Sequence, residues 1–485
     1  MSDSNAEITI TLELHPALSR VLASSDALVT KINRAVLLRC AELIAALGIP
    51  GELVTQNVET RDESFFDDQI IKVAVNDEVC SCSGQLLRGV FCYVSDNWLD
   101  QGLSISQMLS WLLEADKQEG RADFQIEGER LTEFLSMACQ EIIKWQPFVL
   151  LGSTQLLAYR DLLMAAARDL ALPAEDWLPA PDQLFLILRR VLLFRISLLD
   201  RSAIVRALQR ASGHSWEDMA EELLDTLSLN VIEIHLSRDY LCLLTIGCTM
   251  KEVNLFREMR TNLFQEAGML YPELQFVTVD SLKPYSFMFK INHLTTYPWI
   301  GAPLLFSWIE EQNSENGNET AADGARAAEN DASGGQQPAQ PAGMELWNKY
   351  HPMASSYLLS WLRATLVGYS YCFITRKEVK NRLSLLTATT PRLNTFVQQG
   401  ILSVERVTQV LRMLIVNDVS IRNLSAILER MLEFDYMLTD PANPISFEEF
   451  FPFPTTPDIA QLNDPRNIAF FVKEGLKRYL ITSSS

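Results

Sequence analysis

Residues 407–431 read VTQVLRMLIVNDVSIRNLSAILERM, and the spacing of their apolar side chains predicts two helices joined by a short turn. Asn417 and Asp418 interrupt the apolar pattern. Ser420 then stands where a helix N-cap is expected, with a hydroxyl that can accept a backbone N–H bond. The apolar faces comprise Val407, Val410, Leu411, Leu414 and Ile415 in the first helix, and Ile421, Leu424, Ile427, Leu428 and Met431 in the second. Such a hairpin by itself requires only core packing and capping.

The same apolar pattern occurs in residues 184–208, which align with 407–431 without a gap at an offset of 223. Five aligned pairs are identical: Leu188/Leu411, Arg189/Arg412, Ser197/Ser420, Ala203/Ala426 and Ile204/Ile427. Nearer the start of each half, 12–15 (LELH) matches 232–235 (IEIH), and Gly48 matches Gly268, both at an offset of 220. This nearly constant offset predicts a tandem duplication.

Each half reads as a strand, a helix and a strand pair, followed by several helices. ITITLELH (8–15) and LNVIEIHL (229–236) alternate apolar and polar residues as half-buried strands do. Short strands segregated from helices predict an α+β fold of two tandem related units, each a small mixed sheet-plus-helix subdomain followed by a helical bundle. We expect a degenerate first copy at 1–225, and a second copy with an α/β part at 226–309 and a helical part at 344–485.

The segment between the two parts of the second copy, 310–343, has no aromatic residue and no Leu, Ile or Val. Such a composition cannot bury enough apolar surface to offset the entropy of ordering the chain. The sequence therefore predicts a disordered acidic insertion there.

The chain of 485 residues carries 41 basic and 61 acidic side chains, a formal net charge of −20. A strongly acidic protein repels phosphate, which argues against nucleic-acid binding and against an anionic membrane surface. The densest basic cluster is Arg376, Lys377, Lys380 and Arg382 at helical spacing. We interpret it as a solvated helix face.

The most apolar runs, 183–200 and 296–309, do not predict a membrane span. The first contains Arg189, Arg190 and Arg195, and the second has 14 residues, whereas a spanning helix needs about 20. The N-terminal residues lack a basic region followed by an apolar run, so no secretory signal is expected. Eight dispersed cysteines fit free thiols in a reducing cytoplasm.

No pattern of residues predicts catalysis, and we expect no enzyme, no cofactor and no metal. The five histidines are dispersed, and no paired C-x-x-C, H-x-x-x-H, G-x-S-x-G or Gly-rich phosphate loop occurs. Cys80 and Cys82 fit alternating strand residues better than metal ligands, and Asp67-Asp68 and Glu448-Glu449 fit solvated loops. Residues 447–453, FEEFFPF, are interpreted as a segment that docks onto the core, with a partner-binding patch as the alternative.

The 407–431 hairpin closely resembles the signature of the cytosolic domain of the type III secretion and flagellar export-gate family (FHIPEP). In that family an apolar helix leads into a V-S-I-R-D-L-x-x-I-L-E turn and helix. The matching residues are Val419, Ser420, Ile421, Arg422, Leu424, Ile427, Leu428 and Glu429, and Asn423 replaces the usual Asp. Further resemblances follow in family order: 229–244 to an opening strand, 272–291 to a strand pair with Asp280 at its Asp, 373–379 to L-G-R-Q-E-V, and 464–478 to a late helix.

The resemblance covers about 228–480 and, more faintly, 8–225, where Leu199 and Arg201 stand at the positions of Arg422 and Leu424. It implies a non-enzymatic component of a bacterial export apparatus that binds other export proteins, secretion substrates or chaperones. A homo-oligomer and peripheral association through export membrane proteins stay open. The family's eight-helix membrane half has no counterpart here, so we expect a protein other than the gate itself. The alternative is a cytoplasmic adaptor or scaffold, unrelated to secretion, that keeps the fold.

Overall fold

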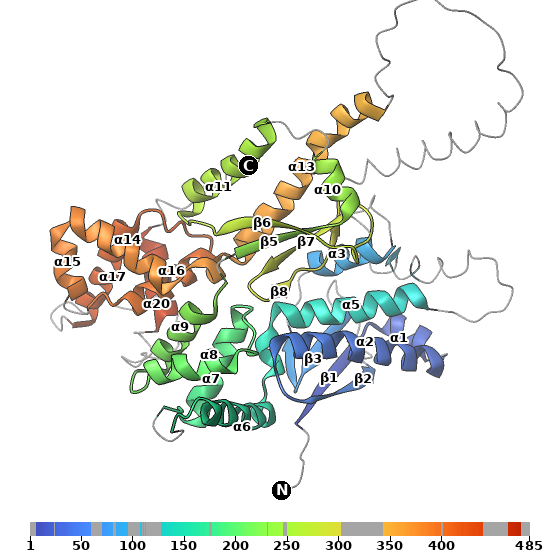
Figure 1. Ribbon diagram of the computed structural model, residues 1–485, viewed down its shortest axis with the longest axis horizontal. Helices are drawn as coiled ribbons and strands as arrows, with labels where there is room; N and C mark the ends of the chain where they lie inside the picture. The colour runs from blue at the N-terminus through green and yellow to red at the C-terminus, as the bar shows by residue number, and fades with distance from the viewer. Residues whose placement is uncertain are drawn as a thin grey trace, which may run out of the picture.

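The computed structural model describes residues 6–23, 25–59, 70–80, 84–95, 107–108, 110, 112, 128–173, 177–229, 231–245, 250–301, 343–398, 401–439 and 464–476. Within these ranges the chain forms two small mixed sheets and many helices, which confirms the predicted α+β class (Figure 1). The segment 310–343, except Gly343, and the segment FEEFFPF lie outside the described residues, as do Asp67-Asp68 and Glu448-Glu449.

The first sheet has the strand order β2-β1-β3-β4. Its strands are β1 (Glu7–Leu14), β2 (Glu52–Glu59), β3 (Ile71–Val75) and β4 (Glu78–Cys80), and helices α1 (Pro16–Leu22) and α2 (Asp26–Leu47) connect β1 to its parallel neighbour β2. The alternating residues Ile8, Ile10 and Leu12 are buried in the core. The predicted strand is therefore confirmed, and its apolar side faces inward.

The second sheet has the order β6-β5-β7-β8, with β9 beside β7. Its elements are β5 (Val231–Leu236), α10 (Arg238–Thr245), α11 (Met250–Ala267), β6 (Glu273–Thr278), β7 (Ser286–Ile291), β8 (Leu294–Thr295), β9 (Trp299–Ile300) and α13 (Gly343–Gly368). As in the first sheet, the first two strands are parallel and the third pairs antiparallel with the first. The paired residues also correspond, because Glu13 opposes Lys72 and Glu233 opposes Lys290.

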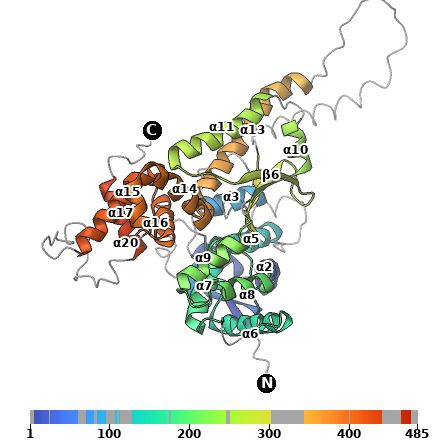
Figure 2. The ribbon, with the colours of Figure 1, turned by 60° about the vertical axis from the view of Figure 1, so that its left-hand side comes forward.

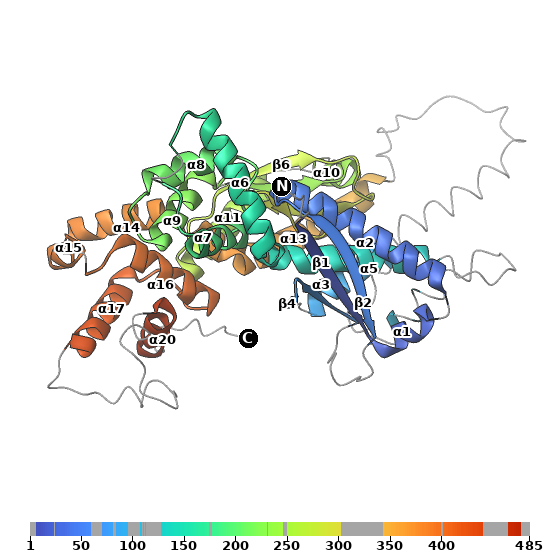
Figure 3. The ribbon, with the colours of Figure 1, turned by 90° about the horizontal axis from the view of Figure 1, so that it is seen from below.

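A group of helices follows each sheet. The first half contains α3 (Gly84–Ser95), α5 (Glu129–Trp145), the 3-10 helix η3 (Pro147–Leu150), α6 (Ser153–Asp169), α7 (Pro181–Leu193), α8 (Arg201–Arg210) and α9 (Trp216–Leu227). The second contains η4 (Ser370–Phe373), α14 (Arg376–Thr389), α15 (Pro391–Gln398), α16 (Val404–Val416), α17 (Leu424–Thr439) and α20 (Pro465–Gly475). Figure 3 shows α7, α8 and α9 to the left of the first sheet with its helices α1 and α2, whereas α6 reaches the sheet and contacts β1.

Equivalent helices begin at a constant spacing in the two halves. The starts of η3 and η4, of α7 and α16, and of α8 and α17 are each 223 residues apart: Pro147 and Ser370, Pro181 and Val404, Arg201 and Leu424. A duplication would produce such a correspondence of order and spacing. The duplication and the domain boundaries themselves remain predictions.

The two halves pack closely against each other. Helix α5 contacts β3 of the first sheet and also α3, which contacts β9 of the second sheet (Figure 1). In Figure 2, α9 of the first half lies beside α14 and α16 of the second, in agreement with its contacts to both helices. The interface therefore lies along the sheets and along the helical bundles.

Candidate functional site

The signature hairpin is made mostly of core residues. Val419, Ile421, Leu424, Ile427 and Leu428 are all buried. The first helix ends at Val416, and Asp418 follows with a φ of 58°. These five positions are therefore fixed by packing between α16, α17 and their neighbours rather than by contact with a ligand.

The prediction that Ser420 is the N-cap of the second helix is wrong, because the cap lies three residues further along the chain. Helix α17 begins at Leu424, and the backbone N–H of Ala426 donates to Oδ1 of Asn423 at 3.2 Å, so Asn423 is the capping residue. Ser420 instead accepts a bond from the N–H of Arg422 at 3.4 Å. Asparagine caps as well as aspartate does, so the substitution of Asn423 for the family's Asp keeps the cap.

The turn of the hairpin docks on the C-terminus of α11. The N–H of Ile421 donates to the carbonyl of Ala267 at 2.9 Å, and Nη1 of Arg422 donates to the carbonyl of Gln265 at 3.4 Å. Gly268 follows α11 with a φ of 77°, and a Cβ there would lie 2.3 Å from the nitrogen of Arg422. The signature residues thus join the helical part to the sheet part, and a cation lies near the negative end of the α11 dipole.

The first half repeats this joint with different side chains. The N–H of Leu198 donates to the carbonyl of Leu47 at 2.8 Å. A Cβ at Gly48, where φ is 71°, would lie 2.8 Å from the nitrogen of Leu199. Leu199 stands at the position of Arg422, and its uncharged side chain cannot interact with the negative end of the α2 dipole. The hydroxyl of Ser197 instead donates to the carbonyl of Ala46 at 2.7 Å. The backbone contact is therefore the same in both halves, while the side-chain contacts differ.

The remaining signature residues do not join a common site. Glu429 is exposed on α17, where its Oε1 accepts from the hydroxyl of Ser425 at 3.4 Å. Asp280 is exposed after β6 and pairs with Arg238 at 3.3 Å. The predicted signature set therefore combines a structural hairpin with two surface carboxylates.

A buried cluster of charges crosses the interface between the halves. Glu221 of α9 is 0% exposed, and its carboxylate accepts hydrogen bonds from both terminal nitrogens of Arg412, with Oε2 at 3.0 Å from Nη2. Nη2 of Arg190 lies 2.8 Å from the same carboxylate. Burial alone would raise the pKa of the Glu221 carboxyl, but Arg412 and Arg190 outweigh burial, and the pKa lies below its ordinary value.

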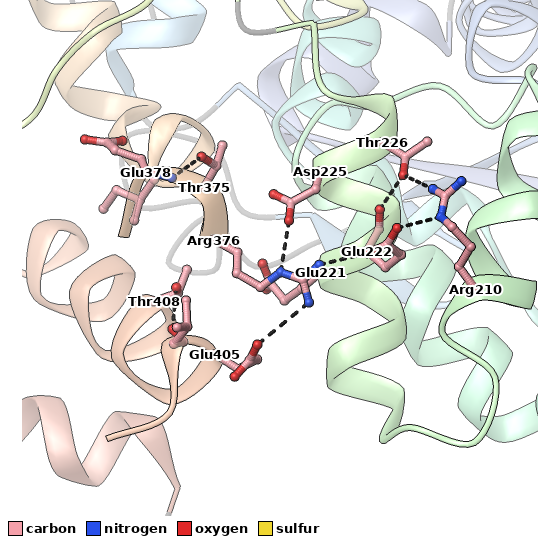
Figure 4. Close-up of polar contacts among 12 residues, drawn as sticks. Arg210, Glu221, Glu222, Asp225, Thr226, Thr375, Arg376, Glu378, Glu405 and Thr408 are labelled. Carbon is pink, nitrogen blue, oxygen red and sulfur yellow. Dashed lines mark hydrogen bonds and ion pairs between the residues drawn. The ribbon is translucent and has the colours of Figure 1, made fainter. Parts of the chain in front are cut away.

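Arg376 extends this cluster toward solvent (Figure 4). Its Nε lies 3.0 Å from Asp225, its Nη2 lies 2.8 Å from Glu222, and its Nη1 lies 3.7 Å from Glu405. The predicted solvated basic face is therefore wrong for Arg376, and also for Arg382, which pairs with Glu378 at 2.6 Å. Lys377 and Lys380 are exposed as expected. Two members of the cluster, Arg376 and Arg382, are therefore paired with carboxylates, and the two lysines are exposed on α14.

A second contact between the two halves is centred on Arg195, which is 1% exposed and has a φ of 61°. Its Nη1 donates to the carbonyl of Lys144 and to the hydroxyl of Tyr369, both at 3.1 Å, and its Nη2 donates to the carbonyl of Thr295 at 3.0 Å. The guanidinium also lies 4.5 Å from the centre of the Tyr369 ring. Burial raises the pKa of Tyr369 to about 12, so its hydroxyl stays neutral and accepts this bond.

The candidate binding surface is a groove of about 800 Å³ on the second sheet subdomain. It lies between α11 and β6 and is lined by apolar side chains of Phe256, Phe264, Met269, Leu270, Leu274 and Phe276. Phe264, Leu270 and Phe276 are exposed in spite of their size. Arg257, Arg260 and Glu273 also line the groove. Exposed large apolar groups gathered in a concave surface are typical of protein-binding sites.

This groove was not anticipated from the sequence. Phe256 and Phe264 fit the apolar face of a helix, and periodicity cannot distinguish a face that packs on the sheet from one that borders a groove. The only available signal was the number of aromatic residues on neighbouring elements, which core packing explains equally well.

No cluster of side chains that could hold a metal ion is found in the ranges that the structure describes. No group of three or more His, Cys, Asp or Glu side chains comes together there. His235 faces Glu233 at 2.7 Å, and Glu233 also pairs with Lys290 at 2.8 Å, a cross-strand contact of the second sheet. Cys80 is buried at the end of β4. Among the helices described, none is both long and apolar enough to cross a membrane.

The sequence matches the model of the FHIPEP family over residues 151–444, more than half of the chain. The chain belongs to the FHIPEP family, which confirms the resemblance drawn from the hairpin. The matched range begins at residue 151, among the helices of the first half. The family model therefore covers part of the first half, in addition to the region after residue 228 that carries the stronger resemblance. A search of curated proteins finds no match.

Several solved structures are similar to parts of this chain. A chain in the structure of the Chlamydia pneumoniae CdsV and CdsO protein complex is 18% identical, and the alignment covers 51% of this chain and 65% of that one, with a TM-score of 0.33. Nonameric SctV-C of EPEC is 14% identical, with coverages of 51% and 65% and a TM-score of 0.31. Shigella flexneri MxiA is 15% identical, with coverages of 52% and 65% and a TM-score of 0.30. The chain spans just under two thirds of these structures.

Proposed function

We propose that this protein is a non-enzymatic binding component of a bacterial type III export apparatus, acting at the cytoplasmic face of the membrane. Its partners would be other export proteins, secretion substrates or chaperones. It would need no cofactor, metal or nucleic acid. The observation that carries this proposal is membership of the FHIPEP family together with an exposed apolar groove on the subdomain that the signature turn holds in place.

We also propose that the chain arose by tandem duplication, with copies at 1–225 and 226–485 and an insertion at 310–343. Common strand order, matching strand pairing and helix starts 223 residues apart support this history. The two joints at Gly48 and Gly268 support it as well, because each glycine abuts the equivalent turn of its own half. The first half has lost the charged residue at the position of Arg422, so the second half is the better candidate for a retained binding role.

The proposal is tested by recovering partners of the tagged full-length protein from cells that express a type III export system. We expect export chaperones, the export ATPase or both to co-purify, and light scattering of the purified protein to give a mass above that of one chain. A matched variant, Phe276→Ser, removes one exposed ring from the groove and should recover less partner at equal expression. A monomer that recovers no export protein would contradict the proposal, and recovery of other proteins alone would favour the scaffold alternative.

A further inference from the structure

The outer side of β6 is an open strand edge. The strand pairs with β5 on one side, and within the described ranges no strand pairs with its other side. The N–H of Val279 donates toward β5, to the carbonyl of Leu236 at 2.8 Å. Successive residues of a strand turn their N–H and C=O to opposite sides, so Leu274, Phe276 and Thr278 direct theirs away from β5. Such an edge can pair with an added strand.

The open edge lies beside the apolar groove. Leu274 and Phe276, two of the three outward-facing residues, also line the groove, and the ring of Phe276 lies 5.5 Å from that of Phe256, edge to face. A strand added to β6 would therefore place every second side chain toward α11 and the groove. Backbone bonds would supply affinity, and the groove would select the alternate side chains.

The charges that line the groove indicate the chemistry of such a strand. Arg257 and Arg260 are exposed on α11, and Glu273 is the acidic residue that lines the groove with them. Nη2 of Arg260 donates to the carbonyl of Tyr271 at 2.8 Å, so Arg257 is the side chain better placed to meet a partner. This excess of positive charge, on a protein with a net charge of −20, favours a segment that carries carboxylates.

We infer that β6 and the groove bind an extended segment of a partner protein by strand addition. The segment has apolar side chains at alternate positions and carboxylates at the flanking positions on the same face. That the segment belongs to an export protein rests on the proposed function, whereas the mode of binding does not.

The test uses the full-length protein and a synthetic peptide, acetyl-Thr-Glu-Thr-Leu-Thr-Phe-Thr-Leu-Thr-Glu-Thr-amide. Its sequence is a palindrome, so it presents the same face in either strand direction. We expect saturable binding by calorimetry, and slower amide hydrogen exchange in residues 272–279. A copy that is N-methylated at every residue from the first Leu to the second Leu keeps every side chain but loses the backbone donors toward β6 in either strand direction, and should bind at least about tenfold more weakly. A second copy with Lys in place of Glu should also bind more weakly.

Two matched proline variants test whether the peptide binds at the edge of β6 or at the equivalent edge of the first sheet. Thr278→Pro removes an outward N–H of β6, and Thr55→Pro removes an outward N–H of β2, which pairs with β1 in the same way. Only Thr278→Pro should weaken binding, and Arg257→Glu should reverse the preference between the Glu and Lys peptides. No binding at about 1 mM peptide, equal binding of the N-methylated peptide, or an equal loss in both proline variants would overturn the inference. Peptide binding without recovery of export proteins would instead remove only the proposed function.

Discussion

Glu221 shows how strongly one buried carboxylate can join the two halves. It lies at 0% exposure between Arg412 of the second half and Arg190 of the first. We expect Glu221→Gln to lower the free energy of unfolding by about 3–5 kcal/mol, because it leaves two cations buried without their partner. Urea denaturation followed by circular dichroism measures the change. Glu266→Gln, which breaks an exposed pair with Arg363, is the control and should cost less than about 1 kcal/mol.

The stability difference between the native protein and Glu221→Gln should also depend on pH. The folded-state pKa of Glu221 lies below its ordinary value. Its contribution to stability is therefore complete above the unfolded pKa of about 4.3 and is lost as the pH falls through the folded pKa. The difference in unfolding free energy between the native protein and Glu221→Gln should be constant from pH 7 to 5 and should shrink below about pH 4. A difference that grows on acidification would contradict this account of the cluster.

Gly268 is required at the joint for two separate reasons, its backbone angle and the space around it. Gly268→Ala should lower the unfolding free energy by about 2–5 kcal/mol, since it adds left-handed strain to a clash with the Arg422 backbone. Gly213 also has a positive φ, 83°, but nothing lies within 4 Å of its added Cβ. Gly213→Ala should therefore cost only the strain of about 1–2 kcal/mol. Thermal unfolding of both variants separates the two effects, and equal losses would show that the joint is not tightly packed.

At the scale of elements, residues close in sequence were predictable and pairings between distant segments were less so. The 407–431 hairpin and both opening strands follow from periodicity, which depends on neighbouring residues alone. Glu52-Leu53 aligns in sequence with Glu273-Leu274, at an offset of 221 residues. The strand pairing does not follow this alignment, because Leu12 opposes Asn57 whereas its counterpart Ile232 opposes Leu274. The register of a strand pair depends on how the side chains of both strands pack in the core. The sequence of β2 alone therefore does not determine its register.

The turns after α7 and α16 have the same backbone shape but different surroundings. Arg195 and Asp418 have φ values of 61° and 58°, yet Arg195 is buried between the halves and Asp418 is exposed. Asp418→Gly should stabilise the protein by up to about 1 kcal/mol by relieving left-handed strain. Arg195→Gly should destabilise it by about 3 kcal/mol or more, because two hydrogen bonds across the interface and one within the first half are lost. Urea denaturation of both variants provides the comparison, and effects of the same sign would contradict it.

At the scale of the whole molecule, the sequence predicted two related units but not how they pack. Glu221 and Arg412 are 191 positions apart, and each resembles an ordinary polar residue of an amphipathic helix. Only the folded chain shows that one neutralises the other. The groove was hidden for the same reason, since Phe276 in a strand is indistinguishable from a core residue until its neighbours are known. The pairing of Arg376 on α14 with Glu222 and Asp225 on α9 likewise depends on the fold, because the sequence of neither helix reveals it.

The packing of the halves predicts that they associate without a peptide link. Chains 1–228 and 229–485, expressed together, should co-purify as a one-to-one complex, because Phe194 packs against Tyr371 with ring centres 5.6 Å apart, and Arg195 and Arg412 bond across the interface. Size-exclusion chromatography with light scattering measures the complex. The variant Glu221→Gln with Arg195→Gly should separate into its two chains, because both buried polar contacts are lost while each half keeps its own sheet and helices. Separation of the native pair at micromolar concentration would mean that only the covalent link keeps the two units together.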